Sequence, residues 1–109
     1  MGLIAIAMDA PSTFVVDRYV VETLLPDLVG HDRRASAFLV YMVILAAAAD
    51  GRVALSHAQL AERAGLSRRS VQTAVALLRR RQLIEVSRRA ATDISEYRPL
   101  SPWRRQAAW

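Results

Sequence analysis

The stretch from residue 57 to residue 78, HAQLAERAGLSRRSVQTAVALL, restricts the fold of this chain more than any other. Its apolar residues recur at helical spacing on both sides of Gly65, which stands where the chain must turn sharply. Leu66 follows as a hydrophobic plug, and the small Ala61 lets two helices approach closely. The pattern predicts two short helices, 57–64 and 68–81, each preceded by a serine that can cap it.

The second of these helices has one apolar side and one basic, polar side. Its apolar residues follow the i, i+3, i+4, i+7 spacing of a buried stripe: Val71, Ala74, Val75 and Leu78. The residues off this stripe are Arg68, Arg69, Gln72, Thr73, Arg79 and Arg80. An apolar back with an Arg/Gln/Thr front is typical of a helix presented to the major groove of DNA.

The flanking segments supply further elements. Residues 13–16 are β-branched or aromatic and predict a short strand, and Asp17 can cap a helix to about Leu25, which Pro26 and Gly30 would end. Asp32 is the expected N-cap of a long, nearly all-apolar central helix over 33–49. Short strands are expected at 52–55, 83–87 and 94–98, with a loop over 88–93.

The stretch 57–78 resembles the helix-turn-helix of bacterial DNA-binding proteins. Ala61, Gly65 and Val71 match its three most characteristic positions, and Leu60 and Leu66 match hydrophobic ones. The segment 81–86 resembles the lead into the wing of MarR-like and GntR-like regulators, and also the helix-turn-helix domains of phage and plasmid replication initiators. The resemblance implies a mainly α winged helix-turn-helix fold with a small β-hairpin wing.

This resemblance divides the chain into three parts. The winged helix-turn-helix domain covers residues 33–98. Residues 1–32 form an N-terminal extension, a short strand and helix that either completes the core or makes a dimer contact. Residues 99–109 form a tail with two tryptophans, which is expected to be a short helix or loose.

Charge is distributed very unevenly along the chain. All 15 basic residues are arginine, which is always charged and is suited to phosphate and guanine. Residues 1–50 carry three arginines and six acidic residues, net −3, whereas residues 51–109 carry twelve arginines and four acidic residues, net +8. The second half is therefore expected to bind an anionic partner.

The resemblance also implies roles for particular side chains on double-stranded DNA. Arg68, Arg69, Gln72 and Thr73 are expected to reach base edges, and Ser67 to meet a phosphate at the helix N-terminus. Arg88 and Arg89, at the expected wing tip, would reach the minor groove or the backbone. Arg79, Arg80 and Arg81 either contact DNA or interact with the negative end of their own helix. Of these three, Arg79 is the expected DNA contact.

Other classes of protein find little support. The absence of cysteine removes disulfides, thiol nucleophiles and Cys-ligated metals, and two histidines are too few for a His-rich metal site. Glycine-rich phosphate loops and hydrolase motifs are absent, so we expect no enzyme, cofactor, metal or small-molecule ligand. The apolar start lacks a basic region and the longest apolar run is too short to span a bilayer, which predicts a cytoplasmic protein.

These observations favour a bacterial DNA-binding protein, most simply a small transcriptional regulator that binds as a homodimer. A plasmid, phage or conjugative-element protein that binds an origin, or acts in replication or partition, fits the same residues. A non-specific nucleoid-type binder is a weaker alternative. From another class, a winged-helix protein–protein adaptor would leave the arginine face without a role.

Overall fold

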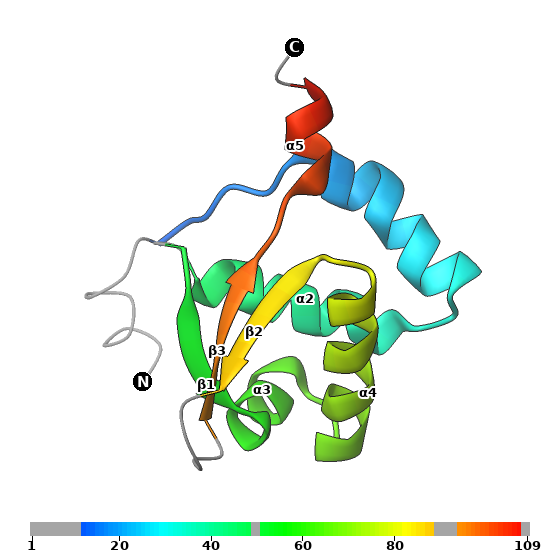
Figure 1. Cartoon of the computed structure of the whole chain (residues 1–109). Coiled ribbons are helices and arrows are strands. Elements are labelled where there is room, and N and C mark those ends of the chain that lie inside the picture. Colours follow the sequence, from blue (N-terminus) through cyan, green and yellow to red (C-terminus); the bar gives the residue numbers. More distant parts are fainter. Residues whose placement is uncertain (1–11, 49–50, 89–93, 108–109) are drawn as a thin grey trace.

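The computed structural model describes residues 12–48, 51–88 and 94–107, with side chains as far as residue 104. Helices and short strands follow one another along the chain, and the strands form one small sheet (Figure 1). Their bounds are η1 Val20–Leu24, η2 Pro26–His31, α2 Ala35–Ala47, β1 Val53–Ser56, α3 His57–Ala64, α4 Arg68–Arg80, β2 Ile84–Arg88, β3 Ile94–Pro99 and α5 Pro102–Ala107. This arrangement is the expected winged helix-turn-helix fold.

The wing is part of a three-stranded antiparallel sheet in the order β1-β3-β2. The predicted hairpin forms between β2 and β3, where Val86 pairs with Tyr97. The short strand expected at 52–55 is present one residue later, and it pairs with the other edge of β3, where Val53 meets Tyr97. Tyr97 thus lies on the central strand and is fully buried against the core.

The helix-turn-helix follows the local rules of its sequence closely. Ser56 and Gln59 form a reciprocal capping box at the start of α3, with Ser56 Oγ 3.1 Å from the Gln59 backbone nitrogen. Gly65 ends α3 in the left-handed conformation at φ 71°, as expected for the turn. Ser67 caps α4 by accepting a hydrogen bond from the Ser70 backbone N–H at 3.1 Å.

The core forms around α2, which packs against both α3 and α4. The predicted apolar stripe of α4 is buried, and it meets Leu60 and Ala61 of α3. The side chains of α2 that are fully buried here are Ala37, Val40, Tyr41 and Ile44. The central, buried position predicted for this helix is confirmed.

The N-terminal segment differs from its prediction. Residues 13–16 form no strand. The helical backbone runs from residue 18 to residue 31, in π-helical geometry from Val20 with one α-helical residue at Leu25, instead of ending near residue 25. Pro26 is tolerated because it stands in the first turn of η2, where a missing N–H costs little.

The start of α2 is also corrected. Asp32 is not its N-cap, because that position is held by Arg34 and the helix begins at Ala35. The Asp32 carboxylate instead binds the guanidinium of Arg81. Instead of capping the helix next to it, Asp32 accepts a charge-assisted hydrogen bond from an arginine 49 residues further along the chain. The helix ends at Ala47, and the predicted end at residues 49–50 lies outside the described residues.

Val20, Leu24 and Leu28 of the N-terminal helix are buried in the same core cluster as α2 and α4. Their burial favours core completion by this segment over a purely dimeric role. The tail packs on the same region, since the Trp103 ring stacks on Tyr19 with 4.7 Å between centroids. Asp17 accepts hydrogen bonds there from Trp103 Nε1 at 2.8 Å and from Arg104 Nε at 2.6 Å.

Candidate nucleic-acid interface

One side of α4 faces away from the core and carries most of the predicted site. Arg68, Arg69, Gln72, Thr73 and Arg79 are all exposed on it, whereas the stripe that begins at Val71 is buried. Exposed Ala76 lies among them and was not predicted. The helix therefore presents a polar and cationic surface in which the methyl group of Ala76 is the apolar part.

Two of the predicted polar contacts are already engaged within the helix. The Ser67 hydroxyl accepts from the Ser70 backbone and also donates to Ser70 Oγ at 3.0 Å. The Thr73 hydroxyl donates to the Arg69 carbonyl oxygen at 3.1 Å. In this geometry, Thr73 offers its methyl group and a hydroxyl acceptor to a partner, and its hydrogen is already used.

Ion pairing separates the arginines of the second half into two groups. Arg52 pairs with Glu96 and Arg98 with Glu85, each at 3.1 Å, while Arg104 pairs with Asp17. Within the described part of the chain, no ion pair involves the exposed arginines of α4: Arg68, Arg69, Arg79 and Arg80. Six described arginines of the second half thus make no ion pair, and four of them lie on this helix; the other two are Arg63 and Arg88.

Arg81, at the end of α4, behaves differently from its neighbours. Its guanidinium binds the carboxylates of Asp27 and Asp32, both from the N-terminal half. The hydrogen bond from Arg81 lowers the pKa of Asp27, and the same contacts raise the pKa of Arg81. Arg81 therefore connects the N-terminal helix to the end of α4 through two acidic partners. Its interaction with the negative end of its own helix stays a prediction.

The wing side of α4 gathers further positive charge. Burial, together with the charges of Arg68 and Arg88, lowers the pKa of His57 at the start of α3. This effect places the first residue of α4 and the last residue of β2 in one electrostatic neighbourhood. Arg89, the other predicted wing contact, lies outside the described residues.

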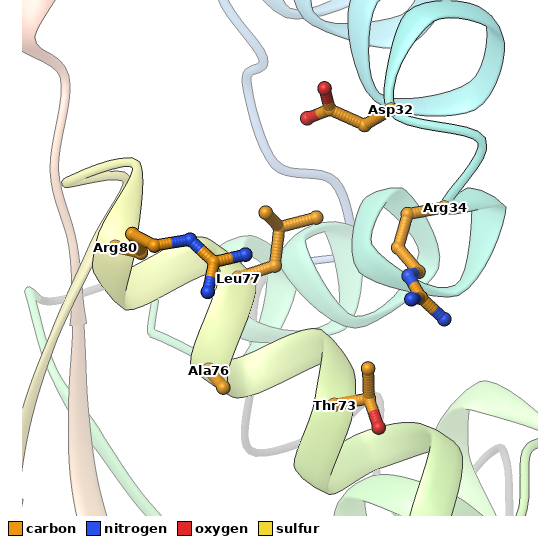
Figure 2. Close-up of a pocket in the computed structure, with 6 residues that line it drawn as sticks. All are labelled: Asp32, Arg34, Thr73, Ala76, Leu77 and Arg80. Carbon is orange, nitrogen blue, oxygen red and sulfur yellow. The ribbon is translucent and has the colours of Figure 1, made fainter.

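A groove runs along the side of α4 that faces away from the wing, between this helix and the turn before α2 (Figure 2). It encloses about 390 Å³ and is lined by Asp32, Arg34, Thr73, Ala76, Leu77 and Arg80. Figure 2 shows the Arg34 side chain extending from that turn toward the level of Thr73, and the Arg80 side chain extending from α4 toward Leu77. Arg34 was not among the predicted site residues, and for Arg80 the sequence left open a DNA contact or an interaction with the end of its own helix. The signal that could have indicated Arg34 is the pair of adjacent arginines at 33–34, within a half of the chain that is acidic overall.

Residues 12–48, 51–88 and 94–104 hold neither a metal-ion cluster nor a membrane-spanning helix. No group of three His, Asp or Glu side chains there can hold a metal ion. No described helix combines the length and apolar character needed to cross a membrane.

Comparison with known proteins places the fold in a family. The family of Crp-like helix-turn-helix domains matches residues 33–100, nearly the range expected for the winged domain. No curated protein and no solved structure matches the chain. The narrower resemblance to MarR-like and GntR-like regulators, or to replication initiators, stays a prediction. Because the matched range spans more than half of its residues and contains the whole α2–β3 unit, the chain belongs to the Crp-like helix-turn-helix family and carries a DNA-binding domain of that type.

Proposed function

We propose that this protein is a sequence-specific binder of double-stranded DNA that acts as a small transcriptional regulator. The observation that carries the proposal is the exposed face of α4, on which four arginines have no acidic partner in the described chain. Such a helix, held on a buried apolar back, fits the width of the major groove.

Particular side chains take distinct tasks in this proposal. Arg68, Arg69 and Gln72 occupy the first turns of α4, where a recognition helix usually reaches base edges. Arginine can bind guanine O6 and N7 with two hydrogen bonds, and glutamine can bind adenine in the same way. Thr73 adds a methyl group for apolar contact with thymine.

The remaining predicted residues position the protein on the duplex. Ser67 and Arg79, at opposite ends of α4, would contact the backbone, and Arg88 with Arg89 would approach it from the wing. A single domain of this size buries little DNA surface, so specificity calls for two copies on a repeated half-site. Homodimer formation is therefore part of the proposal.

Fluorescence anisotropy with duplex DNA tests this function. Wild type should bind random-sequence DNA in 50 mM salt and much more weakly in 200 mM salt, and site selection should yield a preferred sequence. The Arg68→Ala/Arg69→Ala variant should lose ~1–3 kcal/mol of discrimination for each base pair that an arginine reads, which is roughly 5- to 150-fold. The matched control is Arg18→Ala, which removes an exposed arginine from the N-terminal helix.

The outcomes separate the classes of function. Salt-dependent binding without any sequence preference would indicate a nucleoid-type protein and contradict the specific reading. No binding even in low salt would contradict DNA binding altogether and favour a protein–protein adaptor. Footprinting upstream of the protein's own gene, compared with a replication origin, separates a regulator from an origin-binding protein.

A further inference from the structure

The groove beside α4 has the chemistry of a phosphate site. Two guanidinium groups reach it from separate elements, Arg34 from the turn before α2 and Arg80 from the last turn of α4. Both side chains are exposed, and neither makes an ion pair with any described residue. Thr73, Ala76 and Leu77 form a floor of small and apolar groups between them.

Among the described residues that line this groove, Asp32 is the only acidic one. Its carboxylate is already bound by Arg81, which is anchored in turn by Asp27. Arg34, Arg80 and Arg81 carry three positive charges against the two negative charges of Asp27 and Asp32, so these groups in and beside the groove have a net charge of +1. An anion, and not a cation, is therefore the partner that the groove fits.

The groove also has a definite place relative to the recognition surface. In Figure 1, β2 and β3 lie on one side of α4, and the turn before α2 lies on the other. Thr73, Ala76 and Arg80 lie three and four residues apart and so share one strip of the helix, which borders the base-reading positions and includes one of them, Thr73. A duplex seated on α4 would bring one strand's backbone along this strip and the other toward the wing.

We propose that the backbone of one DNA strand lies in this groove, with Arg34 and Arg80 each binding one phosphate. The inference rests on the proposed function and adds a sequence-independent anchor on the side of α4 opposite the wing. Arg34 lies in the half of the chain whose net charge is negative, so the charge distribution along the sequence does not predict that it binds a phosphate.

The slope of log binding constant against log salt tests the proposal, because each neutralised phosphate contributes about 0.9 to it. The Arg34→Ala/Arg80→Ala variant should lower the magnitude of the slope by about 1.8, and each single variant by about 0.9. Arg80→Lys, which keeps the charge, should retain the slope, as should the remote control Arg18→Ala. The ratio of affinities for the preferred and a scrambled sequence should stay unchanged in all of them.

Three other results would each overturn the proposal. If wild type shows no DNA binding, the proposed function fails and the groove assignment fails with it. If wild type binds and the double variant keeps the full slope, or loses sequence preference instead, only the groove assignment fails. If calorimetry with inorganic phosphate alone shows binding that the double variant loses, while its DNA slope is unaffected, the groove belongs to a free phosphate. Thermal melts of the variants should match wild type, because both side chains are exposed.

Discussion

Replacing Leu28 by alanine should unfold this domain more readily, although Leu28 lies outside the helix-turn-helix. The side chain is fully buried against the core that contains α2 and α4. The change removes three carbon atoms, worth about 2.4 kcal/mol at ~0.8 kcal/mol each. The cavity left behind adds to this, so we expect a loss of about 3 kcal/mol, within the ~2–5 kcal/mol range of such substitutions.

Urea unfolding followed by circular dichroism measures this loss directly, and thermal unfolding gives a second reading. For a domain of about this size, 1 kcal/mol corresponds to roughly 4 °C, so the melting temperature should fall by about 12 °C. Val29→Ala is the matched control, because it lies on the same helix and its side chain is 40% exposed. It should cost well under 1 kcal/mol.

The same pair of variants distinguishes the two roles of the N-terminal segment. If Leu28→Ala costs less than 1 kcal/mol, the segment does not complete the core and the packing argument is refuted. If Val29→Ala instead lowers stability in a manner that depends on protein concentration, the exposed side of the helix is a contact between two copies. Sedimentation over a range of concentrations checks that second result.

Three smaller perturbations test single interactions. Ser56→Ala removes the capping box of α3 and should cost about 1 kcal/mol in urea unfolding. Gly65→Ala should cost ~1–2 kcal/mol through left-handed backbone strain alone, since no described atom beyond its chain neighbours lies within 4 Å of the added carbon, and Gly65→Asn should cost less. The hydrogen bonds from Arg104 and then Trp103 lower the pKa of Asp17 to about 2, so its contribution to stability is complete above its unfolded pKa of about 4 and is lost as the pH falls toward 2. The difference in urea midpoint between wild type and Asp17→Asn should therefore shrink over that interval, and a constant difference would contradict the assigned contact.

The helix-turn-helix could be predicted from sequence because local rules determine most of it. The caps at Ser56 and Ser67, the turn at Gly65 and the stripe that begins at Val71 each depend on residues within a few positions of one another. The residues of α4 that do not belong to the apolar stripe then form its exposed face, and this is how its arginines were predicted to be exposed. Which of them contact DNA stays a prediction.

The N-terminal segment was predicted less well because tertiary contacts override its local signals. The β-branched residues at 13–16 have no neighbouring strand to pair with among the described residues, so their propensity has no effect. Pro26 predicts the end of a helix. The helix nevertheless continues to His31, because Leu24 and Leu28 on either side of the proline are buried in the core. Sequence reasoning also missed the groove, since Arg34 and Arg80 are brought together only by the packing of α2 against α4.

Acidic residues of the first half of the chain form ion pairs with arginines of the second half in the folded protein. Read locally, Asp17 and Asp32 are helix caps, but the structure uses them to bind Arg104 and Arg81 of the second half. Each such pair neutralises an arginine away from the exposed face of α4 and ties a terminal segment to the domain. Eight described arginines are then without an ion pair. Four lie on α4, Arg33 and Arg34 lie in the turn before α2, Arg63 lies on α3 and Arg88 lies at the wing. Ion pairs formed elsewhere thus leave half of the described arginines without an acidic partner on one helix face, and such a cluster of positive charge favours the steering of a polyanion onto that helix.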